Sequence, residues 1–415
     1  MAFVHFAEKT NAMKPCIKFL LSAAALLSPS CEFLDKPSAP SQEVSPRPVS
    51  LQEVASIFAS IPIGMEQIEE VYDAVSASVS NGYDEEYTLG DLFASPGAGV
   101  GDRAVRSSVS KAGRTAGAKS YRKPLRDLIK EHLTATKSSL DYASDPEEYI
   151  TALTSSDIQI YWPYSEKWNS SQYPIITYDP SDGSDTNIGY KLSRKEDGTL
   201  GVEEVIVDEE LAKTSPVWVV NRNNDGGYSS LEMLRKTDPS WGSGGGDIIV
   251  GTKAAQEGTI KTLLLKTFTA NRNYDSWLAG GSEFFVKCGS VENFTATTEN
   301  EMLMYNPSVT DFMIVVKRSE IGVKRPFNAI LVSSWTGQLE NCAFMITEDD
   351  GGTVTNWKCA AEVKIKSKSY GFDISIPFNS RDDIVWRGQL SGAYFEKYSG
   401  QTGHFGDVDL TFEVL

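Results

Sequence analysis

The sequence predicts a mainly β protein with an α-helical N-terminal segment and a C-terminal β-sandwich. Apolar residues recur with helical spacing between residues 51 and 140. Beyond residue 150 the apolar runs become short, and turns rich in Asp, Gly, Ser and Pro separate them. From about residue 259 to the end these runs are numerous enough to predict two packed antiparallel sheets.

Residues Met13–Cys31 have the layout of an export signal. Lys14 and Lys18 form a short basic region, and the apolar run Phe19–Leu27 is too short to span a bilayer. Small residues then lead to Cys31, and this arrangement resembles a bacterial lipoprotein signal. The resemblance implies that Cys31 becomes a lipidated first residue, with Met13 a better start than Met1. The alternative is an ordinary secretory signal with an incidental cysteine.

The segment that follows predicts a tether and then a folded body. Residues 31–50 are rich in Pro and Ser and lack periodicity, as in extended linkers. Ser50 and Glu53 have the spacing of a capping box, which predicts a helix start there. The predicted organisation is a signal at 1–30, a tether at 31–50, a helical segment at 51–140, a small β-rich domain at 141–245 and a β-sandwich at 246–415.

The charge balance limits the partners. The chain carries 39 Lys and Arg against 56 Asp and Glu, a net charge of −17. Such a surface repels nucleic acid and anionic lipid, so neither is an expected main partner. No other run is apolar enough to span a membrane, so any membrane attachment is expected through lipid on Cys31. The same acidity favours divalent cations.

The cysteines suggest one disulfide. Cys342 and Cys359 flank the turn signal Asp349–Gly352. A two-residue turn at Asp350 and Gly351 would place the two cysteines opposite each other at a non-hydrogen-bonded position of a hairpin. A cross-strand disulfide is the prediction for an oxidising compartment, and two buried thiols on one apolar face are the alternative.

The densest aromatic stretch is a candidate ligand-binding platform. Aromatic rings bind sugars by stacking on the apolar faces of pyranoses, and the same rings fill cores. Strand alternation would send Tyr161 and Trp162 to opposite faces, so core packing is the favoured interpretation. The candidate glycan-binding residues are Tyr161, Trp162, Tyr164 and Trp168.

The most specific motif after the signal lies at residues 221–232. Its spacing resembles the calcium loop of the EF-hand, in which short oxygen side chains at alternate positions, a glycine and a later carboxylate surround one ion. Asn replaces the usual first Asp, and a strand-like run precedes the loop in place of a helix. The resemblance implies a weak calcium site, against a simple turn capped by Asn and Asp. The implied ligands are Asn221, Asn223, Asp225, Tyr228 and Glu232.

A second resemblance covers most of the last 155 residues. Residues 262–289 are similar to the opening of calcium- and lipid-binding β-sandwiches of the protein-kinase-C type, and residues 344–352 and 380–390 resemble their later Asp-rich loops. The resemblance implies an alternative calcium site at one end of the sandwich. Its residues are Asp275, Asp349, Asp350, Asp382 and Asp383.

The residues offer little support for an enzyme. Only His132 and His404 follow the signal, and neither lies in a nucleophile or zinc motif. The style of the chain resembles surface lipoproteins of Gram-negative bacteria. We therefore expect a surface-exposed outer-membrane lipoprotein with a non-enzymatic binding or adhesion role, whose partner is a glycan or a host protein and whose candidate cofactor is Ca²⁺.

Two rival functions remain open. One is a secreted carbohydrate-active enzyme, in which acids such as Glu166 and Asp179 would act beside the aromatic stretch. The other is a fimbrial or assembly component that donates or accepts a strand.

Overall fold

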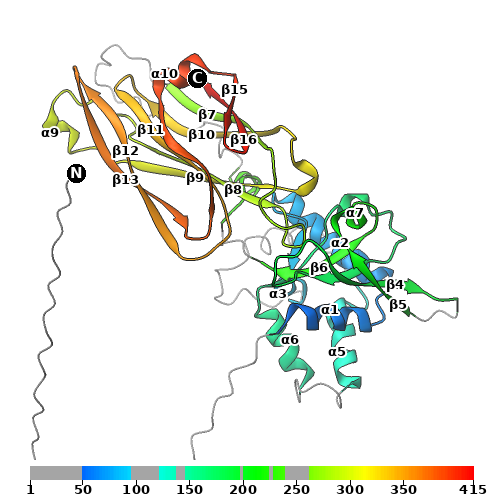
Figure 1. The fold of residues 1–415 in the computed structure, drawn as a ribbon. Coiled ribbons are helices and arrows are strands. Elements are labelled where there is room, and N and C mark those ends of the chain that lie inside the picture. The colour runs from blue at the N-terminus through cyan, green and yellow to red at the C-terminus, as the bar shows by residue number, and fades with distance from the viewer. Residues whose placement is uncertain (1–48, 95–120, 137–144, 197–199, 224–227, 239–260) are drawn as a thin grey trace, which may run out of the picture. The chain divides into compact units, whose positions relative to one another are not determined.

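Helices come first along the chain and antiparallel sheets come last, as the sequence predicts (Figure 1). The computed structural model describes residues 49–94, 121–136, 145–196, 200–223, 228–238 and 261–415. The predicted signal, the tether up to residue 48, Cys31 and Asp225 lie outside these residues. No helix in the described ranges combines the length and the apolar character needed to cross a membrane.

The helices of the N-terminal segment begin at capped positions. The Ser50 hydroxyl accepts a hydrogen bond from the Glu53 amide at 3.2 Å, as the capping motif predicts. The Glu70 carboxylate accepts from the Leu125 amide at 2.7 Å and caps a helix far along the chain. The helices are α1 (Leu51–Ser60), α2 (Met65–Ser80), α3 (Leu89–Leu92), α5 (Leu125–Ala135) and α6 (Pro146–Thr154).

These helices accompany a six-stranded mixed sheet. Its order is β1-β2-β6-β3-β4-β5, and every neighbouring pair is antiparallel except β3 with β6. The strands are β1 (Glu86–Thr88), β2 (Ile158–Tyr161), β3 (Ile175–Tyr178), β4 (Asn187–Arg194), β5 (Leu200–Val207) and β6 (Val217–Arg222). Short helices lie between or after them: η1 (Ser165–Lys167), α7 (Glu209–Ala212) and α8 (Leu231–Thr237).

The helices and this sheet share one apolar core. Phe58 of α1, Ile68 of α2 and Ile129 of α5 are buried in the same cluster as Trp162 and Trp218, which follow β2 and lie in β6. Neither the helices nor the strands could bury their apolar faces alone. The expected boundary between residues 140 and 141 therefore runs through a common core.

The C-terminal part is two antiparallel sheets packed face to face. One has the order β10-β7-β16-β15, and the other has the order β13-β12-β11-β8-β9 with β14 paired to β11. The strands are β7 (Lys261–Ala270), β8 (Ser282–Ser290), β9 (Ser308–Val316), β10 (Arg325–Trp335), β11 (Leu339–Glu348), β12 (Val354–Ile365), β13 (Lys368–Asn379), β14 (Asp383–Ser391), β15 (Thr402–Phe405) and β16 (Val408–Val414). The helices are α9 (Glu299–Met302), η2 (Arg318–Glu320) and α10 (Gly392–Lys397). One buried cluster takes residues from both sheets, including Phe268 and Phe344, and this packing confirms the predicted sandwich.

The loop between β7 and β8, residues 271–281, joins the sandwich to the mixed sheet. Its Trp277 and Leu278 are buried in a cluster with Tyr161, Val217 and Val219. The indole N–H of Trp277 donates to the Asp185 carbonyl at 2.7 Å. The loop is therefore held by residues of the mixed sheet, although it connects two strands of the sandwich.

Candidate metal centre

Three chain segments bring acidic residues to one end of the sandwich. The register of β11 places Glu348 opposite Phe284 of β8 on one side and opposite Asp383 of β14 on the other. The Asp349 amide continues this ladder and donates to the Glu283 carbonyl at 3.0 Å. The remaining acids lie in the loops next to these strand ends. Pairing between strands that are distant in the sequence therefore assembles the cluster.

The centre of the cluster is a triad of Asp275, Glu283 and Glu348. One carboxylate oxygen from each lies within 4.8 Å of the other two. Glu283 and Glu348 are buried, with 6% and 0% of their surfaces exposed, and Asp275 is half-buried. Three carboxylates held this closely repel one another unless protons or a cation neutralise them.

Two members of this triad, Glu348 and Asp275, have buried oxygens that lack the hydrogen-bond donors buried carboxylates normally have. Both carboxylate oxygens of Glu348 and Oδ2 of Asp275 are buried without a hydrogen-bond partner. The Ser282 hydroxyl lies near Glu348 and lowers its pKa slightly, but it donates to Oδ1 of Asn273 at 2.7 Å. Glu348 is therefore a fully buried acid that points into an acidic cluster, with no donor to stabilise its charge.

Burial and mutual repulsion raise the pKa values of these acids. Burial raises the pKa of Glu348 above its ordinary value, and the nearby Asp275 and Asp350 carboxylates raise it further. Burial also raises the pKa of Asp275, while the neighbouring Glu348 carboxyl lowers it, and a further increase from Asp350 is opposed by the Arg318 guanidinium. Without a cation the site consequently retains protons at a pH where ordinary carboxyls are ionised.

The loop that carries Asp275 is fixed by its backbone. Nη1 of Arg318 donates to the carbonyls of Asp275 and Gly280, both at 3.2 Å, and Nε of the same side chain pairs with Glu209 at 2.8 Å. The buried Asp84 carboxylate accepts from the Gly281 amide at 2.6 Å. These contacts position the Asp275 backbone and leave its side chain directed at the other two acids.

The remaining aspartates surround this triad. Oδ1 of Asp349 accepts from the Gly351 amide and from the Asn379 side chain, both at 2.9 Å. Oδ2 of Asp382 accepts from the Asn379 amide at 2.8 Å, and burial with the nearby Asp349 raises the pKa of Asp382 to about 6. Burial raises the pKa of Asp350, and the charge of the nearby Asp383 carboxylate raises it further.

The triad is compatible with a hard divalent cation. Calcium takes about six to eight oxygen ligands at about 2.4 Å, so two ligands on opposite sides of the ion are about 4.8 Å apart. The spacing of the three carboxylates fits within this span. A bound Ca²⁺ would neutralise the repulsion, and the protein would supply Asp275, Glu283 and Glu348 as ligands.

Two of these three residues escaped the sequence analysis. Asp275 and the outer aspartates were recognisable from Asp-rich turns. Glu283 and Glu348 sit at the ends of apolar strands, in Ser-Glu-Phe-Phe and Ile-Thr-Glu, where a glutamate usually faces solvent. The available signal is that a strand as apolar as β11 ends with three consecutive acids, Glu348–Asp350.

In the loop that resembles an EF-hand, the side chains of the described asparagines make contacts other than those of a calcium site. Asn221 lies in β6, and its side-chain amide donates to the carbonyls of Leu278 and Ala279. The Asn223 amide donates to the Gln159 side chain at 2.9 Å. Their amide N–H groups thus serve to hold the β7–β8 loop and β2.

The other two members of the EF-hand-like set lie apart from these amides. The Tyr228 carbonyl, the expected ligand atom, accepts from the Tyr83 hydroxyl at 3.3 Å. The Glu232 side chain approaches Gly82. The described residues therefore show no shared set of ligand oxygens at 221–232, and Asp225 lies outside them.

The aromatic stretch forms core, not an exposed platform. Tyr161 and Trp162 are fully buried on opposite faces, as strand alternation predicts, and Tyr164 is 7% exposed. Trp162 packs against Trp168 and Trp218. The favoured interpretation, core packing, is confirmed for Tyr161, Trp162 and Tyr164. The alternative of a glycan-binding surface is wrong for these three because the helices and the β7–β8 loop cover both faces of the sheet there. Trp168 is only partly buried.

The predicted Cys342–Cys359 disulfide is also wrong. Both cysteines are free thiols, as is Cys288. β12 pairs with β11 only at the end far from the turn, where Asn341 faces Glu362, and β14 pairs with β11 along Asn341–Glu348, so Cys342 faces Leu390 of β14 and not Cys359. Cys342 instead contacts Cys288 of β8, whose thiol pKa is raised by that contact and by burial.

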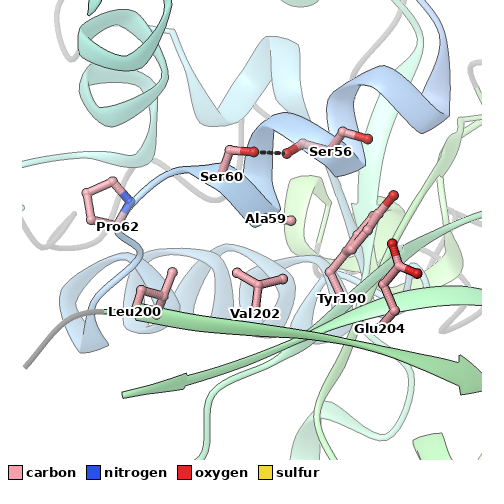
Figure 2. A pocket seen from close by; sticks show the side chains of 8 residues that line it. All are labelled: Ser56, Ala59, Ser60, Pro62, Tyr190, Leu200, Val202 and Glu204. Carbon is pink, nitrogen blue, oxygen red and sulfur yellow. Dashed lines mark hydrogen bonds between the residues drawn. The ribbon is translucent and has the colours of Figure 1, made fainter. Parts of the chain in front are cut away.

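A groove separate from the acidic centre lies between α1 and the β4–β5 hairpin (Figure 2). It has a volume of about 470 Å³. Its helical side is formed by Ser56, Ala59, Ser60 and Pro62, and its floor by Tyr190, Leu200, Val202 and Glu204. Glu204 is the acid among these lining residues.

No family model, curated protein or solved structure matches this chain. The acidic centre and the groove are therefore interpreted from their own geometry.

Proposed function

We propose that this protein is a non-enzymatic binding lipoprotein of the cell envelope whose sandwich is stabilised by a bound calcium ion. The observation that carries the proposal is the buried acid Glu348, which has two oxygens without donors and faces the Asp275 and Glu283 carboxylates. An unpaired buried carboxylate costs several kcal/mol, which a bound cation offsets. The envelope location rests on the sequence of residues 13–31, and the acidic surface suits an extracellular setting where calcium is plentiful.

Calcium is favoured over magnesium by the kind of ligand on offer. Magnesium keeps several waters and requires a small octahedral shell at about 2.1 Å, whereas calcium accepts a wider and less regular set of oxygens. Three carboxylates on two strand ends and one loop form such an irregular set. Nearby acids at Asp349 and Asp350 would add to the attraction without direct contact.

Isothermal titration calorimetry with Ca²⁺ and with Mg²⁺ tests the proposal on the purified protein after EDTA treatment and dialysis. We expect one calcium site, with magnesium at least about tenfold weaker. Asp275→Asn should weaken calcium binding by at least tenfold, because it removes one of three anionic ligands. Asp373→Asn, at an exposed position on β13, is the matched control and should leave binding unchanged. Undetectable calcium binding in the millimolar range would refute the proposal.

A further inference from the structure

The β5 strand forms an open edge of the mixed sheet. It is the last strand in the sheet order, and in the part of the chain that the structure describes it pairs only with β4. Its outer edge therefore presents a row of backbone N–H and C=O groups that another strand could pair with. Its residues, Leu200–Val207, are rich in Val and Ile, which favour extended pairing.

One face of the β4–β5 hairpin is largely apolar and is only partly covered by α1. Leu192 of β4 is buried in the core beneath the helices, and side chains two and four positions away share its face. On this face Ile188 is 46% exposed, Val202 is 51% exposed and Ile206 is 67% exposed. These are large apolar side chains left uncovered beside a free backbone edge.

An acid interrupts this apolar row. Glu204 lies between Val202 and Ile206 on the same face, and it lines the groove under α1 together with Val202 (Figure 2). Across the β4–β5 ladder its neighbour is Tyr190, so no basic residue of β4 stands opposite it. The adjacent Glu203 points to the other face, where Lys191 is its cross-strand neighbour.

A second copy of the chain fits this edge poorly in the register that aligns the exposed apolar residues Val202 and Ile206. In an antiparallel β5–β5 pair, the register that matches Val202 with Ile206 of the other copy also places Glu204 directly opposite Glu204. Like charges directly opposite each other destabilise a strand pair. The occupant that complements this edge instead carries a basic residue between two apolar residues.

We propose that the β5 edge binds an extended segment of a partner protein by strand addition. The segment carries the pattern apolar–x–(Lys or Arg)–x–apolar, with these three side chains opposite Ile206, Glu204 and Val202. Antiparallel pairing gives the more stable ladder, and alternate side chains then meet the apolar face and its central acid. The side chain opposite Val202 lies at the mouth of the groove. This inference is independent of the calcium proposal because it uses a different sheet.

Three synthetic peptides test the inference on the purified protein. The matched peptide is Thr-Ile-Thr-Lys-Thr-Val-Thr, the charge-reversed peptide has Glu in place of Lys, and the permuted peptide exchanges Ile and Lys. Binding is measured by NMR titration up to about 1 mM, a range in which weak peptide complexes are detected. We expect the matched peptide alone to bind the wild type and to shift or protect amides within residues 200–207.

Two single variants separate pairing from general electrostatics. Glu204→Lys should weaken the matched peptide at least about tenfold and should gain binding of the charge-reversed peptide. Glu203→Lys makes the same change in net charge on the opposite face and should change binding by less than about threefold. Circular dichroism establishes that both variants are folded.

Three outcomes would overturn the inference. The first is equal binding of the matched and permuted peptides, and the second is a perturbation that falls outside β5. The third is no binding of any peptide at about 1 mM, in which case the two glutamates serve only to keep the edge unpaired.

Discussion

The substitution Glu348→Gln separates the two states of the acidic centre, because it changes charge and not shape. In the cation-free protein Glu348 is fully buried beside Asp275, and its ionised form has no donor. Glutamine resembles the protonated acid, so its introduction removes the repulsion. We expect the melting temperature in EDTA to equal or exceed that of the wild type.

In calcium the same substitution should have the opposite effect. A ligand that binds only the folded state at a hundred times its dissociation constant stabilises it by about 2.7 kcal/mol. The compact unit at 47–415 has about 370 residues, and an unfolding entropy of about 2.1 cal/mol/K per residue gives about 0.78 kcal/mol/K. The wild type should therefore melt about 3.5 °C higher in calcium than in EDTA, and Glu348→Gln should lose this difference.

Differential scanning calorimetry in EDTA and in millimolar calcium measures both effects. Glu340→Gln makes the same chemical change at the other end of β11, where the side chain is paired with Lys364, and should keep the full calcium shift. If Glu348→Gln kept the full shift as well, the ion would bind elsewhere and the interpretation of the triad would be refuted.

Two further predictions concern protons and thiols. In EDTA the melting temperature should fall as pH rises from about 5 to 8. The pKa values of Asp275 and Glu348 are raised on folding, so the folded chain binds more protons than the unfolded chain. The folded chain therefore loses stability as these protons dissociate. Calcium should flatten this profile, and a melting temperature that rises with pH in EDTA would contradict the assignment. For the thiols, peptide mapping after air oxidation should find no Cys342–Cys359 disulfide. Cys359→Ser should leave the melting temperature unchanged. Recovery of the disulfide-linked peptides would show that β12 pairs differently from the ladder described above.

Local sequence patterns predicted the helices and strands well. Long-range strand pairing, which these patterns do not encode, decided which strands became neighbours. The helix start at Ser50, the alternation that buries Tyr161 and Trp162 on opposite faces, and the sandwich all follow from spacing within a few residues. The chain does reverse at Asp350 and Gly351, but β11 and β12 pair only at the end far from this turn, because β14 lies beside β11 along Asn341–Glu348. A turn signal specifies where a chain reverses, but it does not specify which strand lies next to it.

The residues of the candidate site were likewise predictable only in part from the sequence. The aspartates of the three loops could be proposed from turn composition, and the structure gathers them at one end of the sandwich. Glu283 and Glu348 could not, because their burial depends on β8, β11 and the β7–β8 loop meeting at one point. The loop at 221–232 had the stronger motif but not the surroundings, since the amide of Asn221 is used to hold backbone carbonyls.

The β7–β8 loop also limits how this chain can be divided into portable modules. Trp277 and Leu278 complete the core beneath the mixed sheet, while Asp275, two residues before Trp277, belongs to the acidic centre of the sandwich. Excising the sandwich at its first strand would expose an indole and a leucine to water and would leave Arg318 without Glu209. Recombination that exchanged either half would have to carry the β7–β8 loop together with the residues of the mixed sheet that bury Trp277 and Leu278. The two halves are therefore expected to be inherited as one piece.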